Sequence, residues 1–230
     1  MIFRREEKED DTVVTMLASA LRRDISFGAL QPNQKLKIEA LRQRYGGSNH
    51  SMRETLRMLS AEGLVEATAQ RGFRVTSATE EDLRDITLVR SQMERVALTL
   101  AIAQGDTGWE GRVIAAHHAL RKAEDRVARD PDDLTALEWD EACRAFSATL
   151  IEACHSPRLI DLHRKFFDQS RRFRLALLRE GRLDFPARAA RQRALLDAVL
   201  ARDTETAVAI LDQDIAAELK TGGQPPKPRS

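Results

Sequence analysis

The chain has 230 residues, of which 42% are hydrophobic and 32% are charged, a composition that excludes an intrinsically disordered acidic chain and an integral membrane protein. No apolar run approaches the roughly 20 residues that a transmembrane helix needs, and residues 1–10 lack the hydrophobic region of a signal peptide. Cys143 and Cys154 form neither a disulfide framework nor a paired zinc motif. We therefore expect a soluble cytoplasmic protein with one large domain or two modest ones.

Positive charge is concentrated near the N-terminus. Residues 12–77 contain ten lysines and arginines against five acidic residues, whereas residues 78–230 contain 24 against 26. A basic segment joined to a slightly acidic remainder suggests that nucleic acid is bound at one end only. Solvated helix faces often carry the same imbalance, so the charge alone does not decide between these two interpretations.

Residues 7–77 combine helical and extended patterns. Apolar residues at helical spacing predict the helices, and glycine or proline marks the end of each element. The expected elements are helices over 7–27, 38–44 and 48–62, followed by strands over 64–68 and 73–76. The turn at 69–72 suits a hairpin. Two helices around a tight turn, followed by a hairpin, predict a winged helix-turn-helix DNA-binding domain over residues 7–77.

Residues 79–220 show helical periodicity throughout and no convincing strand pattern. Capping residues, glycines and prolines predict six helices, over 79–104, 109–129, 130–154, 156–180, 186–201 and from 203 onward. Such a series forms an all-helical antiparallel bundle. The expected fold class is therefore mainly α, with a winged helix-turn-helix followed by a bundle. Residues 221–230, rich in proline and glycine, are expected to be a disordered tail.

The helix that begins at Ser48 carries residue types that suit DNA recognition. The N-terminal end of a recognition helix reaches base edges in the major groove. Asparagine pairs well with adenine and arginine with guanine, whereas serine and histidine contact phosphates or bases. Arg53 could instead form an ordinary solvated ion pair with Glu54, and Gly72 could belong to any hairpin turn. The candidate DNA-contacting residues are Ser48, Asn49, His50, Ser51, Arg53, Arg57, Arg71 and Gly72.

Three short segments form a recognisable set of sequence motifs: Arg53-Glu54-Thr55-Leu56-Arg57, Ala61-Glu62-Gly63-Leu64-Val65 and Arg71-Gly72-Phe73-Arg74-Val75. Together they resemble the GntR family of bacterial transcription regulators, over residues 12–77. The chain departs from the family pattern at several positions, and the family's common Ser-Arg-Thr-Pro-Val is Ser48-Asn49-His50-Ser51-Met52 here. The usual first base-reading arginine is Asn49, and an arginine of the preceding helix is Glu39, whereas a typical alanine and valine are Arg42 and Gly47. The operator sequence therefore cannot be copied from relatives.

The helical half contains the segments Leu88–Glu94, Phe146–Leu159 and Leu195–Ala207. These segments resemble the FCD type of ligand-binding domain, found in the fatty-acid-regulator branch of the same family. Many such domains hold a divalent metal through an aspartate and three histidines, and the corresponding positions here are Cys143, Ser147, Gln192 and Asp214. One carboxylate with a thiol, a hydroxyl and an amide is a poor ligand set for that cation. The resemblance therefore implies an effector pocket without a metal or other cofactor.

Arg90 falls on the first long helix of this half, near the place where the family holds its effector. A buried arginine requires an anion, which would be either an acidic metabolite or an internal partner, Glu94. We take Arg90, together with Cys143, Ser147, Gln192 and Asp214, as the candidate effector-binding residues. His163 is expected on a solvated face. The basic run at 171–174 is expected to be solvated as well, and contact with an anionic ligand is the alternative.

We expect a homodimeric transcriptional repressor that binds a palindromic double-stranded DNA operator and senses a small organic acid. A single winged domain reads too few base pairs, so two-fold pairing is expected. The alternative is a ligand-independent architectural or partner-binding winged-helix protein, which the lost metal ligands favour. The sequence contains no Ser/His/Asp arrangement, no phosphate-binding glycine loop and no metalloprotease motif, so we expect no enzymatic activity.

Overall fold

A computed structural model describes residues 3–68 and 72–222 of the chain. The chain divides into two compact units, Met1–Ala78 and Thr79–Ser230. Among the described residues, no helix is both long enough and apolar enough to cross a membrane.

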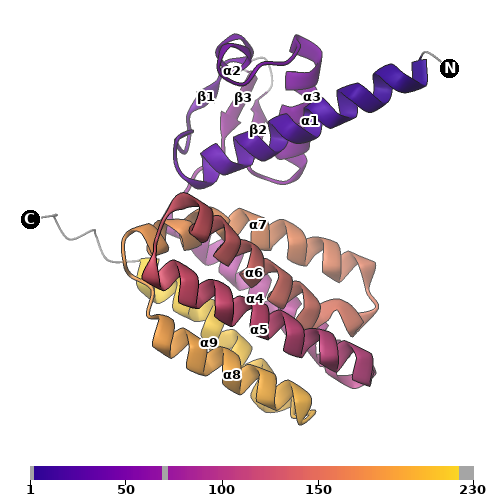
Figure 1. Ribbon diagram of the computed structural model, residues 1–230, viewed down its shortest axis with the longest axis vertical. Helices are drawn as coiled ribbons and strands as arrows, with labels where there is room; N and C mark the ends of the chain where they lie inside the picture. The colour runs from indigo at the N-terminus through magenta and orange to yellow at the C-terminus, as the bar shows by residue number, and fades with distance from the viewer. Residues whose placement is uncertain (1–2, 69–71, 223–230) are drawn as a thin grey trace, which may run out of the picture. The chain divides into compact units, whose positions relative to one another are not determined.

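The first unit combines helices with a small antiparallel sheet (Figure 1). Its described elements are α1 (Phe3–Ser26), β1 (Lys35–Leu36), α2 (Ile38–Tyr45), α3 (Asn49–Ala61), β2 (Val65–Thr68) and β3 (Gly72–Val75). The strand order is β1-β3-β2, with Val65 opposite Val75. The winged helix-turn-helix is therefore confirmed. β1 escapes sequence-based detection because two residues are too few to show an alternating pattern.

The core of the first unit fixes α3 against α1. Leu21 of α1 and Met52, Leu56 and Leu59 of α3 are fully buried. They recur at helical spacing, so each helix buries one face and leaves the other exposed. Burial of an apolar side chain of this size contributes about 1.5–3 kcal/mol to stability. The buried face therefore holds α3 firmly while its polar face stays at the surface.

The second unit is helical throughout its described residues, which confirms the predicted bundle. Its elements are α4 (Glu80–Gln104), α5 (Thr107–Arg129), α6 (Asp133–Ile151), the 3₁₀ turn η1 (Glu152–Cys154), α7 (Pro157–Arg179), α8 (Phe185–Leu200) and α9 (Thr204–Gly222). α9 extends two residues into the segment expected to be a disordered tail. Residues 223–230, the rest of that segment, lie outside the described residues.

Within this unit the helices lie side by side (Figure 1). α4 packs against α7 and α9, α6 packs against α5 and α7, and α8 packs against α5 and α9. Trp109 and Trp139 are almost completely buried, and Nε1 of Trp109 donates a hydrogen bond to the Thr149 carbonyl at 2.8 Å. This packing directs side chains of α4, α6, α7, α8 and α9 towards a common interior, where the candidate effector residues lie.

Candidate nucleic-acid interface and effector cavity

α3 begins with reciprocal hydrogen bonds between Ser48 and Ser51. The Ser51 N–H donates to Oγ of Ser48 at 3.0 Å, and the Ser48 N–H donates to Oγ of Ser51 at 2.9 Å. Ser51 is 1% exposed, so its hydroxyl stabilises the start of the helix and does not face outward. Ser48, Asn49 and His50 are exposed at the same end of α3. Three of the four polar residues predicted at this end therefore lie at the surface.

The turn between α2 and α3 depends on Gly46 and Gly47. Their φ angles are +80° and +82°, in the left-handed region that other residues rarely adopt. A Cβ atom on Gly47 would lie 2.9 Å from Cδ1 of Leu17 and 3.1 Å from Oγ of Ser51. Glycine at position 47 therefore allows the start of α3 to approach the core closely.

Two arginines on the exposed face of α3 differ in their partners. Arg57 forms an ion pair with Glu54, one turn before it. Arg53 is exposed and forms no ion pair within the described residues. Glu54 therefore neutralises Arg57 and not Arg53, and the guanidinium of Arg53 is available to a ligand.

A third guanidinium reaches the start of α3 from α2. Nε of Arg42 donates to the Gly47 carbonyl at 3.2 Å, and Nη1 donates to Oδ1 of Asn49 at 3.4 Å. Nη1 also pairs with Oε2 of Glu39 at 3.3 Å. Four of the positions at which the chain departs from the family pattern thus meet around one arginine: Glu39, Arg42, Gly47 and Asn49. Nothing in their spacing along the sequence predicts this contact.

The wing is described in part. Arg71 lies outside the described residues, so its contacts remain a prediction from the sequence. Gly72 opens β3 opposite Thr68, with a φ angle of +84° and open space around it. A glycine at this exposed position lets the backbone of the wing come close to a ligand.

In the second unit, the five candidate effector residues line one small cavity. The cavity is small, with a volume of about 30 Å³. Its walls include Arg90, Cys143, Ser147, Gln192 and Asp214, together with Glu94, Phe167 and Arg188. α4, α6, α8 and α9 each contribute at least one of these candidates, so residues far apart in the sequence meet at the centre of the bundle.

Arg90 has an internal partner in this cavity. Its Nε donates to Oε1 of Glu94 at 2.9 Å, and Nη1 donates to Oγ of Ser170 at 3.2 Å. Its Cζ lies 5.0 Å from the centroid of the Phe167 ring. Glu94, the alternative partner considered from the sequence, balances the charge of Arg90. An effector carboxylate at Arg90 would therefore compete with Glu94.

His163 is buried beside the same cavity, so the expectation that it lies on a solvated face is wrong. It is 2% exposed, and Nε2 lies 2.8 Å from Oγ of Ser147 and 3.8 Å from Oε1 of Glu94. Burial lowers the pKa of the imidazole. Basic sequence neighbours do not decide the orientation of a helical residue, because a helix of 3.6 residues per turn can direct one member of a basic stretch inward.

Arg188 of α8 is a cavity residue that the sequence patterns do not identify. Nη2 donates to Sγ of Cys143 at 3.4 Å, and Nε donates to Oε1 of Glu124 at 3.1 Å. In the orientation of the Gln192 carboxamide that satisfies both of its polar atoms, the oxygen accepts a hydrogen bond from Nε of Arg188 at 2.9 Å. The nitrogen then donates to Oε1 of Glu124 at 3.3 Å. Arg188 lies one helical turn before Gln192, and this spacing is the signal that could have identified it.

These side chains do not fit a divalent metal ion. Burial raises the pKa of the Cys143 thiol to about 12, whereas a metal requires the thiolate. Asp214, the only carboxylate at the four family positions, pairs with Nε of Arg191 at 3.0 Å. The guanidinium of Arg188 already brings a positive charge against the thiol. Within residues 3–68 and 72–222, no group of three or more His, Cys, Asp or Glu side chains is placed to hold a metal.

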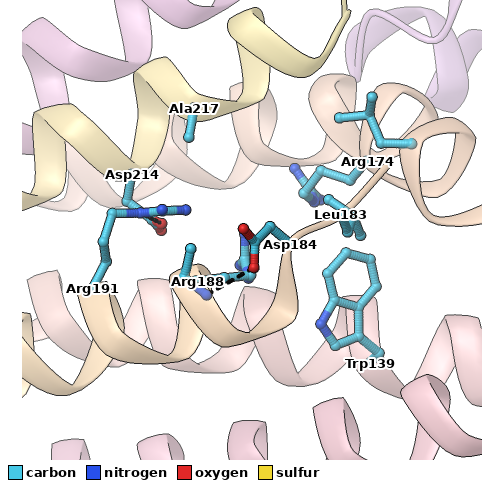
Figure 2. A pocket seen from close by; sticks show the side chains of 10 residues that line it. Trp139, Arg174, Leu183, Asp184, Arg188, Arg191, Asp214 and Ala217 are labelled. Carbon is cyan, nitrogen blue, oxygen red and sulfur yellow. Dashed lines mark hydrogen bonds and ion pairs between the residues drawn. The ribbon is translucent and has the colours of Figure 1, made fainter. Parts of the chain in front are cut away.

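A larger cavity of about 170 Å³ shares Arg188 and Asp214 with the first (Figure 2). Its lining residues are Trp139, Arg174, Leu177, Leu183, Asp184, Ala187, Arg188, Arg191, Asp214 and Ala217. Figure 2 shows Trp139 on the side of the cavity opposite Ala217. Guanidinium groups beside an apolar wall suit a small organic acid, whose carboxylate and carbon skeleton need these two environments.

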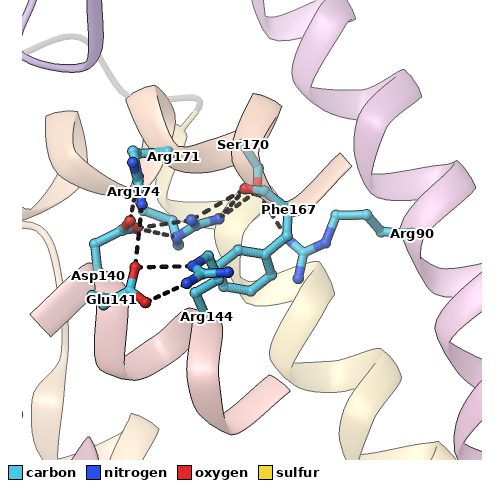
Figure 3. A network of polar contacts seen from close by, with 8 residues as sticks. All are labelled: Arg90, Asp140, Glu141, Arg144, Phe167, Ser170, Arg171 and Arg174. Carbon is cyan, nitrogen blue, oxygen red and sulfur yellow. Dashed lines mark hydrogen bonds and ion pairs between the residues drawn. The ribbon is translucent and has the colours of Figure 1, made fainter. Parts of the chain in front are cut away.

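Asp140 is fully buried and is shared by two arginines of α7 (Figure 3). Nε and Nη2 of Arg174 donate to Oδ1 at 3.0 and 2.8 Å, and Nε of Arg171 donates to Oδ2 at 2.5 Å. Burial opposes ionisation, yet the two guanidinium groups hold the pKa of Asp140 below its usual value. The expectation that this basic run is solvated is therefore wrong for Arg174, which is 1% exposed.

Glu124 of α5 has a similar arrangement, with two arginine partners. It pairs with Arg121 at 2.8 Å and with Arg188 at 3.1 Å, and burial raises its pKa despite both arginines. Like Asp140, it is a single carboxylate between two guanidinium groups. The two clusters reach the wall of the larger cavity through Arg174 and Arg188.

Comparison with known proteins covers both sites. Residues 14–75 match the model of the bacterial regulatory proteins of the gntR family, and residues 85–217 match that of the FCD domain. The chain is 36% identical to the HTH-type transcriptional repressor GlaR of Escherichia coli (strain K12), over 85% of this chain and 89% of that protein. It is also 36% identical to the HTH-type transcriptional regulator BphR of Paraburkholderia xenovorans (strain LB400), over 86% of this chain and 80% of that protein.

A solved structure shares the fold. The GntR transcriptional regulator from Rhodococcus sp. RHA1 superposes with a TM-score of 0.69 at 25% sequence identity, over 91% of this chain and 97% of that one. The matched length includes the helix-turn-helix and the helical bundle.

Proposed function

Because the chain belongs to the GntR family of bacterial regulatory proteins and carries an FCD domain, we propose that it is a homodimeric transcriptional repressor whose helical unit senses a small organic acid. That the protein is a DNA-binding transcriptional regulator follows from its family. Repression is proposed because a relative at 36% identity is a repressor. Operator binding implies a location in the cytoplasm, and the proposal includes no enzymatic step.

The exposed start of α3 is the observation that carries operator recognition. Asn49, His50 and Arg53 are exposed on a helix whose opposite face is buried in the core. A rigid helix with exposed donors at its N-terminal end suits the major groove. The test is a mobility-shift assay of the full chain on the region upstream of its own gene, with unrelated promoters as controls. Failure to shift any of these fragments would contradict the proposal.

The proposed dimer follows from the size of the DNA-binding unit. One helix-turn-helix contacts a single half-site, and two copies related by a two-fold axis contact two half-sites about one helical turn apart. We therefore propose a palindromic operator. Sedimentation of the protein with and without a duplex carrying two half-sites would test it, and a complex with one chain per duplex would contradict it.

The effector is proposed to place its carboxylate against Arg188 and its carbon skeleton along Trp139. Arg188 lines both cavities, and its guanidinium lies against the Cys143 thiol at 3.4 Å. A guanidinium binds a carboxylate through two parallel hydrogen bonds. Arg90 remains a second candidate contact, although Glu94 already balances its charge. Thermal melting of the protein with a panel of small organic acids would identify the ligand.

The alternative function is that of a ligand-independent winged-helix protein. The small volume of the inner cavity and the internal pairing of Arg90 favour it. A specific band shift that no acid of the panel changes, together with an unchanged melting temperature, would support this alternative. A band released by one acid would support the sensor.

A further inference from the structure

The contact between Arg42 and Asn49 fixes what the asparagine presents to DNA. Nη1 of Arg42 lies 3.4 Å from Oδ1 of Asn49. An arginine can only donate hydrogen bonds, so the atom of Asn49 that faces it is the carboxamide oxygen. The Nδ2 group of Asn49, with its two N–H donors, is then the end that remains for another partner.

The guanidinium of Arg42 also has N–H donors that the described protein groups do not use. Nε and Nη1 contact Gly47, Glu39 and Asn49, whereas Nη2 has no hydrogen-bond partner in the part of the chain that the structure describes. The Arg42 side chain is 34% exposed. The surface at this end of α3 therefore carries N–H donors from two residues, one on each helix of the helix-turn-helix.

Guanine and adenine differ in the hydrogen-bonding groups that they present to such a surface. In the major groove guanine presents two acceptors, N7 and O6, whereas adenine presents the acceptor N7 and the donor N6. A free asparagine suits adenine because it accepts from N6 and donates to N7. Once Arg42 engages the oxygen of Asn49 and adds further donors, the pair suits guanine.

We propose that Arg42 is a specificity-determining residue that makes the operator position facing Asn49 a guanine in place of an adenine. The inference rests on the proposed operator binding through α3. The Glu39 carboxylate and the Gly47 carbonyl hold the guanidinium in its orientation before DNA arrives. Such preorganisation lowers the entropic cost of forming the contact.

The test is selection of duplexes from a randomised pool by the full-length protein, followed by sequencing. Asn49→Ala identifies the position that residue 49 faces, because the base preference there relaxes. The wild type is expected to favour guanine over adenine at that position by about tenfold, and Arg42→Ala to favour adenine. Gln43→Ala, which changes an exposed neighbour on α2, is the matched control and keeps the guanine.

Two outcomes would overturn the inference and leave operator binding intact: a retained guanine preference in Arg42→Ala, or a preference of the wild type for adenine. Enrichment of no sequence by the wild type would overturn operator binding and the inference together. Arg42→Met keeps the aliphatic stem of the side chain and replaces Arg42→Ala if the alanine variant melts at a lower temperature. The same change from guanine to adenine is expected for it.

Discussion

Nη2 of Arg188 lies 3.4 Å from Sγ of Cys143, so a permanent positive charge faces a thiol that burial keeps protonated. The two residues come from α8 and α6 and meet inside the bundle. A divalent cation at this point would face the guanidinium and would need the thiol to lose its proton. The contact therefore favours an anion and disfavours a metal.

The first prediction is that the purified protein contains less than a stoichiometric amount of zinc, nickel or manganese. Chelator should leave its melting temperature unchanged, because no metal contributes to the folded state. Elemental analysis and thermal melting measure the two quantities. A tightly held metal ion in every chain, lost on Asp214→Ala or Cys143→Ala, would show that the site does hold a cation.

The second prediction concerns the anchor of the effector. A ligand that binds only the folded state raises stability by about 2.7 kcal/mol at a hundredfold excess over its Kd. Arg188→Ala should lose most of this gain, because the carboxylate loses its bidentate partner. Arg193→Ala removes an exposed arginine from the same helix and serves as the control. Each melting temperature is compared with and without the acid, and an equal gain in both variants would rule out Arg188 as the anchor.

Local patterns were sufficient to predict the α-helices, the two hairpin strands and their order, but not β1. Ser48 marks the start of α3 and Gly63 follows its end, and the apolar spacing of Met52, Leu56 and Leu59 identifies the buried face. The grouping of Cys143 with distant residues around one cavity could be anticipated only from the resemblance to the FCD domain. Helical periodicity places residues on a face but does not say which helices face one another.

Burial of Arg90 beside Glu94 was considered from the sequence, but the burial of Arg174 and His163 could not be predicted. Arg174 and His163 lie in a stretch rich in arginine, and such residues are almost always exposed unless a partner is buried with them. Their partners, Asp140 and Ser147, lie on another helix, so no local pattern reveals the pairing. The contact of Arg42 with Asn49 could not be predicted either, because it joins two helices across the turn between them.

The third prediction concerns Arg53. Arg53→Ala should cost about 1–3 kcal/mol of specific binding and weaken discrimination at one operator position, because no ion pair within the described part of the chain engages the guanidinium. Arg57→Ala should cost less, because Glu54 already neutralises that guanidinium. Fluorescence anisotropy with the operator and with a scrambled duplex separates specific from general binding. Wild-type affinity in Arg53→Ala would contradict the assignment of α3 as the recognition helix.

The fourth prediction concerns the wing. If Arg71 contacts a phosphate, Arg71→Ala should weaken binding to operator and scrambled duplexes by similar factors. The slope of log affinity against log salt should become shallower by about one. Titrations at several salt concentrations measure both effects. Loss of affinity for the operator alone would instead indicate that Arg71 contacts a base.

The last prediction concerns the charge cluster in the second unit. Asp140→Ala leaves Arg171 and Arg174 without their shared carboxylate in the interior, and loss of one member of a buried ion pair costs about 3–5 kcal/mol. Glu141→Ala changes the adjacent residue, whose side chain is 54% exposed, pairs with Arg144 and lies 3.8 Å from Nη2 of Arg171, and it should cost less than about 1 kcal/mol. Urea denaturation at neutral pH measures both variants. A loss below about 1 kcal/mol for Asp140→Ala would mean that the Asp140 cluster does not stabilise the bundle.

The pH dependence of the stability of the wild type and of Asp140→Ala gives an independent check. The pKa of Asp140 is lower in the folded protein than in the unfolded chain, where an aspartate titrates near about 3.9. The unfolded state therefore binds more protons at acid pH, and the contribution of Asp140 is fully present above that value and declines as the pH falls below it. The difference in stability between wild type and Asp140→Ala should be constant from pH 7 to about pH 5 and should shrink below about pH 4. A difference that stays constant into the acid range would mean that the carboxylate is not held ionised by its two arginines.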